Sequence, residues 1–167
     1  MSARPFIDSL EFARNGRKTS GAVPVAQLPR LQDVLESNES TLNYSMQGGT
    51  DRQGIPYLDV SITGNCRLRC QRCLGGLQHA VDINSRLRLR SQAELDALDA
   101  SDVGGDEEEY DSILAENELD VLGLLEEEIL LSLPISPRHE EGECSMAAGT
   151  DERREDNSPF AVLAKLK

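Results

Sequence analysis

Reactive side chains cluster in one short stretch of this sequence, "NCRLRCQRCLGG" at residues 65–76. It holds three cysteines and three arginines within eight positions, and the rest of the chain has one further cysteine, Cys144. Cysteines at this spacing suit a metal knuckle or a redox pair, and arginines suit a contact with phosphate. An ordinary turn between strands, with thiols that bind nothing, is the remaining interpretation.

The spacing of Cys70 and Cys73 lets two thiolates reach one tetrahedral ion, each at about 2.3 Å from it. A zinc site needs two further ligands, and the segment "PRHEEGEC" supplies His139 and Cys144 as H-x4-C. The chain has only two histidines and four cysteines, so this downstream pair makes a structural Cys3His zinc site the specific prediction. Cys66 falls on a predicted strand and is expected to be a packed thiol.

A redox pair of the thioredoxin kind is disfavoured, because that chemistry begins a helix in a βαβ unit, whereas strands flank this pair. The first residues contain no apolar core of a secretory signal, and no apolar run is long enough to cross a bilayer. We therefore expect a cytoplasmic protein whose thiols stay reduced.

Charge is divided unevenly along the chain. Residues 1–90 hold 12 Lys or Arg against 8 Asp or Glu, whereas residues 91–167 hold 5 against 22. RNA could therefore be contacted only by the first half, because phosphate binding needs local positive charge. The acidic half is either simply solvated or faces a basic partner such as a ribosomal protein. An aromatic content of 4% argues against a surface that stacks many bases.

Arginines are concentrated near the cysteines, where residues 66–90 contain only one acidic residue, Asp82. They are Arg67, Arg69, Arg72, Arg86, Arg88 and Arg90. Such side chains could offset the charge of a thiolate-rich metal site or bind RNA phosphates, and the sequence leaves both roles open.

Three segments alternate apolar and polar residues with the period of a strand: "TLNYSMQ", "YLDVSIT" and "VDINSRLRLR". They predict an α+β protein built on an antiparallel β-meander or a partly open barrel, with a few packed helices. The third strand places Arg86, Arg88 and Arg90 on its wet face. "GAVPV" at residues 21–25 is expected to be an edge strand, since its proline cannot donate to a ladder.

Helices are predicted at residues 7–17, 27–36 and 120–133, the last with Asp120 as N-cap and ending at Pro134. Residues 91–112, with "GGDEEEYD", read as an acidic loop.

We expect one α+β domain over residues 1–137. A polar tail over residues 138–167 would follow it and end in a short helix. In that helix Phe160 and Leu163 form an apolar stripe that would dock on the domain or bind a partner.

Three segments resemble the YceD family, the large ribosomal RNA subunit accumulation proteins: "CQRCLGGLQHAVD", "LDVLGLLEEEILLSLPISPRHEEGEC" and "NSPFAVLAKLK". The resemblance extends over most of the chain from about residue 55. It implies a bacterial cytoplasmic protein that supports synthesis, processing or stability of 23S rRNA, directly or through a protein, and it implies no catalytic activity.

The residues themselves also predict a non-enzymatic protein. The sequence shows no Ser/His/Asp set and no phosphate-binding glycine loop, and residues 126–128 are adjacent glutamates that must diverge on a helix. We therefore expect a ribosome-biogenesis factor. The alternative is an acidic adaptor that recruits a ribosomal protein or an rRNA-processing enzyme without contacting RNA.

Overall fold

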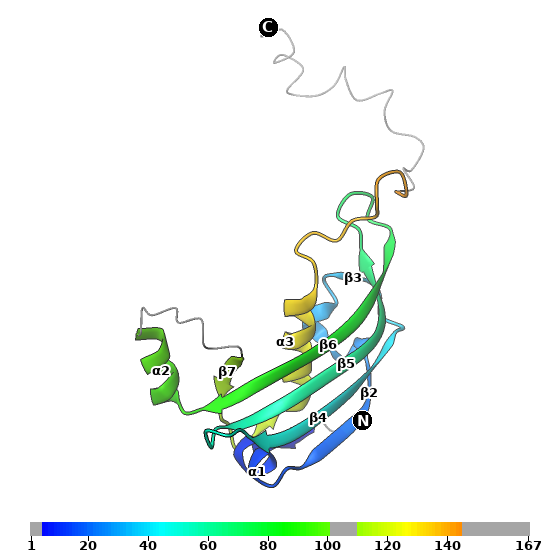
Figure 1. Cartoon of the computed structure of the whole chain (residues 1–167). Coiled ribbons are helices and arrows are strands. Elements are labelled where there is room, and N and C mark those ends of the chain that lie inside the picture. Colours follow the sequence, from blue (N-terminus) through cyan, green and yellow to red (C-terminus); the bar gives the residue numbers. More distant parts are fainter. Residues whose placement is uncertain (1–4, 101–109, 145–167) are drawn as a thin grey trace, which may run out of the picture.

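A computed structural model describes residues 5–100 and 110–144 and shows an open, curved β-sheet with one helix standing beyond its edge and the others beside one face (Figure 1). Within these residues the sheet has six strands. Five are neighbours in the order β2 (Lys18–Pro24), β4 (Thr41–Thr50), β5 (Pro56–Arg69), β6 (Gly76–Arg90) and β7 (Asp111–Leu114). The sixth, β3 (Leu35–Ser37), pairs with the far end of β5.

The pairing confirms the predicted α+β class and the antiparallel meander β4–β5–β6. β2 lies at one edge of the sheet, as predicted, and β7 joins the other edge parallel to β6. The sheet stays open, so the barrel alternative is not adopted.

Alternating side chains explain the two faces of the sheet. Leu58, Val60 and Ile62 of β5 are buried, while the residues between them face water. β5 has 14 residues and β6 has 15, which is longer than the alternating patterns alone indicated. At about 3.3 Å per residue, such a hairpin extends about 45 Å. Its closed end carries the cysteine-rich stretch.

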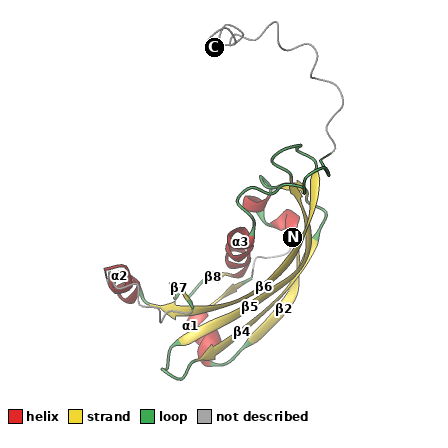
Figure 2. Cartoon of the chain, turned by 45° about the horizontal axis from the view of Figure 1, so that its top comes forward, coloured by secondary structure: helices red, strands yellow, loops and turns green. Residues whose placement is uncertain are grey.

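Helix α1 (Ser9–Arg14) and helix α3 (Val121–Ser132) lie beside the same face of the sheet (Figure 2). Asp120 caps α3 by accepting from the Leu122 N–H at 3.1 Å, and the helix stops before Pro134, both as predicted. A short two-stranded sheet, β1 (Phe6–Ile7) with β8 (Leu119–Asp120), lies immediately before the two helices. Among the described residues, no helix combines the length and hydropathy that crossing a bilayer requires.

The helix predicted over residues 27–36 is wrong. Two single 3-10 turns, η1 (Val25–Gln27) and η2 (Pro29–Leu31), precede strand β3. Pro29 cannot donate a helical hydrogen bond, and the side chain of Gln32 binds the carbonyls of Val25 and Leu28 instead. The leucines of this segment, Leu28, Leu31 and Leu35, are nevertheless buried.

The acidic loop predicted over residues 91–112 is wrong at both of its ends. Helix α2 occupies Gln92–Ala100, and β7 begins at Asp111; residues 101–109 are outside the described part. Ser91 and Glu94 form a capping box, in which the Ser91 N–H donates to the Glu94 carboxylate at 2.7 Å and the Glu94 N–H donates to Ser91 Oγ. This local signal starts α2 although none of its residues is buried.

Close packing requires glycine at two positions inside β4, Gly48 and Gly49. A Cβ at Gly48 would be 2.5 Å from the carbonyl oxygen of Phe12 in α1, and one at Gly49 would be 2.5 Å from the ring of Tyr57. The first glycine therefore lets α1 approach the sheet, and the second makes room for a tyrosine on the polar face.

Three consecutive glutamates fasten α3 to its surroundings. Glu126, only 3% exposed, accepts from the backbone N–H groups of Arg30 at 2.5 Å and Leu31 at 3.2 Å in η2. Glu127 pairs with the Arg30 guanidinium at 3.2 Å, and Glu128 accepts from the hydroxyl of Ser85 on β6. The three carboxylates therefore diverge, as their adjacency predicted, and each holds a different contact.

Replacing Glu126 with Ala should lower the free energy of unfolding by about 2 kcal/mol, because the buried Leu31 N–H and the partly buried Arg30 N–H lose their acceptor. Glu126→Gln keeps a carbonyl oxygen and should cost less. The measurement is equilibrium denaturation by urea. Glu127→Ala is the matched control, since its ion pair is exposed and such pairs contribute about 0.5 kcal/mol. Equal losses for the two alanine variants would contradict this account.

Candidate metal centre

The closed end of the β5–β6 hairpin is a tight loop that brings two cysteines together. The Cys70 N–H donates to the Gly75 carbonyl at 2.9 Å, and the Leu74 N–H donates to the Cys70 carbonyl at 2.9 Å. Leu74 adopts a left-handed conformation with φ of 62°, which is rare for a leucine.

The segment after α3 brings the other two side chains to this loop. The Gln71 N–H donates to the Pro137 carbonyl at 2.8 Å and ties the segment to the hairpin. A turn then reverses the chain, with the Glu143 N–H donating to the Glu140 carbonyl at 3.2 Å and Gly142 at a φ of 91°. This reversal returns Cys144 to the neighbourhood of His139.

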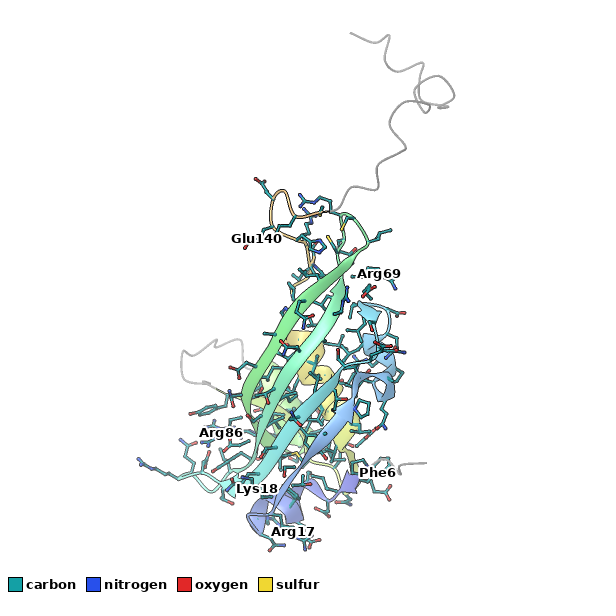
Figure 3. All side chains as sticks on the ribbon, turned by 90° about the vertical axis from the view of Figure 1, so that its right-hand side faces the viewer. Phe6, Arg17, Lys18, Arg69, Arg86 and Glu140 are labelled. Carbon is teal, nitrogen blue, oxygen red and sulfur yellow. The ribbon has the colours of Figure 1, made fainter. Side chains whose placement is uncertain are left out.

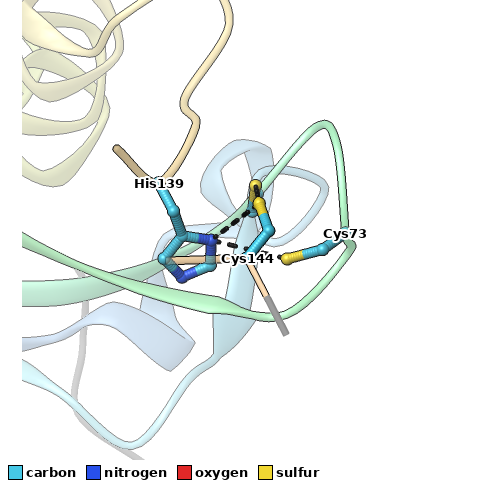
Figure 4. A group of neighbouring side chains, drawn as sticks. Cys73, His139 and Cys144 are labelled. Carbon is cyan, nitrogen blue, oxygen red and sulfur yellow. Dashed lines mark hydrogen bonds between the residues drawn. The ribbon is translucent and has the colours of Figure 1, made fainter. Parts of the chain in front are cut away.

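The four predicted ligands form one group. The sulfurs of Cys70, Cys73 and Cys144 and a ring nitrogen of His139 all lie within 4.8 Å of one another. The Cys70 and Cys144 sulfurs are 3.8 Å apart, and His139 Nδ1 lies 3.4 Å from Cys73 Sγ and 3.7 Å from Cys144 Sγ (Figure 4). A tetrahedral ion with bonds of about 2.3 Å to sulfur and about 2.05 Å to nitrogen has edges of about 3.8 and 3.6 Å. The spacing thus fits such an ion.

Hydrogen bonds orient the histidine and favour the thiolate of Cys70, whereas burial and contacts with the neighbouring thiols raise the pKa of Cys73. His139 Nε2 lies 3.0 Å from the Gly76 carbonyl oxygen, which can only accept, and this contact raises the pKa of His139. Nε2 therefore carries a proton, so Nδ1 is the nitrogen that faces the sulfurs and could bind an ion. Backbone N–H groups of Cys73, His139 and Arg72 lower the pKa of the Cys70 thiol to about 5, although the side chain is buried.

Arg72 compensates the charge of the cysteine group. Its Nε donates to Cys144 Sγ at 3.0 Å, and its Nη2 donates to the carbonyls of His139 at 3.3 Å and Glu140 at 3.2 Å. The sequence left two roles open for the arginines, charge compensation beside the cysteines and phosphate binding. The contacts of Arg72 match charge compensation. Cys66 lies outside the group and is 2% exposed, as predicted, and its burial raises the pKa of its thiol.

With four protein side chains arranged this way, the group can hold a metal ion without leaving a coordination position for substrate. Closed sites of Cys3His composition are structural, whereas catalytic sites keep an open position. An ion bound here could therefore serve to hold the end of the hairpin and the segment after α3 together.

The other five predicted RNA-binding arginines lie on the polar face of the sheet in two places. Figure 3 shows Arg69 near the metal group and Arg86 toward the opposite end of the hairpin. Arg67 and Arg69 are exposed; Arg67 pairs with Glu36 at 3.2 Å, and Arg69 donates to the Leu35 carbonyl at 3.3 Å.

Arg86, Arg88 and Arg90 share one face of β6 and are half-buried. Asp59 on β5 accepts from Arg86 Nε at 2.6 Å and from Nη2 at 2.8 Å. Arg88 has a side chain only 14% exposed and pairs with Asp51 at 3.5 Å. The sequence could not reveal these acidic partners, because strand register brings Asp59 to Arg86 and the turn between β4 and β5 brings Asp51 to Arg88. Phe160 and Leu163 lie outside the described residues.

Comparison with known proteins identifies the family of the chain. The family model described as "Large ribosomal RNA subunit accumulation protein YceD" matches residues 58–167. The chain belongs to the YceD family. A relative of that name from Haemophilus influenzae is 24% identical over 168 residues, which covers 96% of this chain and 94% of the relative. No solved structure matches the chain.

The stretch that matches the YceD model contains the whole metal group. It begins at Leu58, near the start of β5, and includes the hairpin, α3 and all four cysteine and histidine ligands. Strands β2 and β4 precede it. The resemblance from about residue 55 onward is therefore confirmed, and the matched part of the chain includes all four side chains that could hold a metal ion.

Proposed function

We propose that this chain is a non-enzymatic factor for accumulation of the large ribosomal RNA subunit, acting in the synthesis, processing or stability of 23S rRNA. Its membership of the YceD family carries this proposal, together with a relative of that name aligned along almost the whole chain. A closed Cys3His group without an open position also favours a binding role over a catalytic one. The cytoplasm is where such a factor would work.

In this proposal the Cys3His group binds a structural zinc ion. The distances among Cys70, Cys73, His139 and Cys144 support it, as do the proton on His139 Nε2 and the N–H groups around Cys70. Bound zinc would lock the segment after α3 onto the hairpin end. Site formation would then contribute directly to folding, because the ligands come from distant parts of the chain.

Arginines of the polar sheet face would contact RNA phosphates. Two observations support this placement: the hairpin carries most of the arginines of the first half of the chain, and those nearest the metal group are exposed. The acidic second half repels phosphate, which restricts RNA to this face. Arg72 would act mainly on the metal group, since its donors already bind there.

The adaptor alternative also has specific support. Asp59 and Asp51 occupy donors of Arg86 and Arg88, which leaves fewer of them for phosphate. The second half of the chain, with 22 acidic against 5 basic residues, suits a basic ribosomal protein.

Protein purified without chelator should contain about one zinc ion per chain, measured by elemental analysis. Cys73→Ser should lose the metal and several kcal/mol of stability, because folding and site formation are coupled. Cys66→Ser is the control: it removes a buried thiol outside the group and should keep the metal whatever it costs in stability. Only a trace of zinc in the unaltered protein would refute the site.

Replacing Arg86, Arg88 and Arg90 together with Gln should reduce 23S rRNA in cells that depend on this chain, measured as the ratio of 23S to 16S rRNA. The triple Lys variant keeps the charge and should retain part of the function. Arg14 and Arg17 changed to Gln on and beside α1 serve as the control. A folded triple Gln variant with normal 23S rRNA would mean that this face does not contact RNA.

Affinity purification of the tagged chain, with and without nuclease, separates the two candidate functions. Direct action on RNA predicts that 23S precursors are recovered and that protein partners disappear after nuclease treatment. Partners that survive the nuclease in full would instead identify the chain as an adaptor.

A further inference from the structure

The polar face of the sheet carries a furrow that includes Arg86 and Arg88, two of the arginines assigned to RNA phosphates above. It consists of two shallow hollows, of about 530 and 770 Å³, that meet at Arg86 and Tyr110. The first adjoins the turn between β4 and β5 and is lined by Arg52, Arg86, Arg88 and Tyr57. The second lies over the middle of the strands and is lined by amide and hydroxyl side chains, among them Ser45, Gln47, Ser61 and Asn84.

A fixed stack of rings and guanidinium groups divides the two hollows. Tyr57 lies against Gly49, and the Arg86 guanidinium carbon lies 4.0 Å from the centre of the Tyr57 ring. The ring of Tyr110 lies 5.5 Å from the same carbon and 5.3 Å from that of Arg88. Side chains ordered in this way lose little further entropy when a ligand binds.

The stack leaves donors for an anion. Asp59 holds Arg86 through Nε and Nη2, so the Nη1 amino group takes no part in that pair. Arg52 is exposed on the adjacent turn. At this end the one acidic side chain among those that line the hollow is Asp51, against three arginines. At the other end Asp59 is paired with Arg86, and Asp111 is the second acidic lining residue. A phosphate therefore fits only the end formed by the arginines.

We propose that the furrow binds an unpaired nucleotide of single-stranded RNA. Its phosphate would lie at Arg52 and Arg86, and its base would stack at Tyr110 and meet the amides and hydroxyls of the second hollow. This inference rests on the proposed function and names the RNA form that it would use. Unpaired bases expose a face for stacking and edges for amide groups, whereas an A-form duplex hides both.

The low aromatic content of the sequence argued against base stacking, and the structure qualifies that argument. Two of the three tyrosines in the chain, Tyr57 and Tyr110, meet at this one place although 53 positions separate them. A scarce residue type can still form a platform for a single base when the fold gathers it. A long stacking surface remains excluded by composition.

Binding of a short fluorescent single-stranded RNA to the full chain, measured by anisotropy, tests this proposal. Tyr110→Ala should weaken binding about ten-fold or more, and Tyr110→Phe should stay within about two-fold, since a ring is enough for stacking. Arg52→Ala should make the slope of log affinity against log salt shallower by about 0.7, the value of one phosphate contact on a single strand. Asn84→Ala should weaken binding, whereas Asn43→Ala, on the same face but outside the furrow, should not.

Three results would contradict the proposal that the furrow binds single-stranded RNA. They are no binding by the unaltered chain, equal binding by Tyr110→Ala and the unaltered chain, or a preference for duplex RNA of the same sequence. These results are distinguishable from failure of the proposed function. If 23S rRNA still depends on the chain in cells, the proposed function stands and only the furrow is lost. If 23S rRNA does not depend on the chain, the proposed function fails whatever the oligonucleotide shows.

Discussion

Antiparallel pairing of β5 with β6 determines where nearly every side chain discussed above is placed. The register runs from Tyr57 opposite Arg88 to Arg69 opposite Gly76 without interruption. Because side chains alternate between faces, a slip of one residue would turn the arginines toward the core and the leucines toward water. Burial of the apolar residues of these strands, including Leu87 and Leu89, fixes the register. It thereby also determines which residues lie on the polar face. The same register sets Asp59 opposite Arg86.

The tip of this long hairpin has little apolar support, and a metal ion bound by the Cys3His group would stabilise it. A strand pair that extends past its supporting helices has few apolar contacts at its tip, and such regions open most easily. Here the short strand β3 and the segment after α3 cover the tip. The position of that segment depends in turn on α3, which Glu126 and its neighbours fasten to η2 and β6. Cys73 and His139, 66 positions apart, thus meet with the help of the carboxylates that fix α3 between them.

The features that could be predicted from the sequence are those encoded by residues close together in the chain. Alternation in β5 and β6, the cap at Asp120 and the ligand spacings are read within a few residues, and the structure agrees with each. The capping box of Ser91 and Glu94 is equally local, but it begins a segment whose acidic composition is typical of a loop. Pro29 inside a row of well-spaced leucines shows that periodicity alone does not specify a helix. The contacts of Arg86 with Asp59 and Tyr110 depend on register and on β7, and no nearby pattern encodes them.

The charge of the chain limits how it could hold RNA. With a net charge of −13, it cannot attract phosphate from a distance as basic RNA-binding proteins do. Arginines fixed by aspartates and tyrosines act only at contact, where stacking and hydrogen bonding supply the free energy. Such binding would depend weakly on salt, because few phosphates are neutralised. It would also favour an RNA segment that is already unpaired, which an assembling ribosomal subunit offers only until its rRNA has folded.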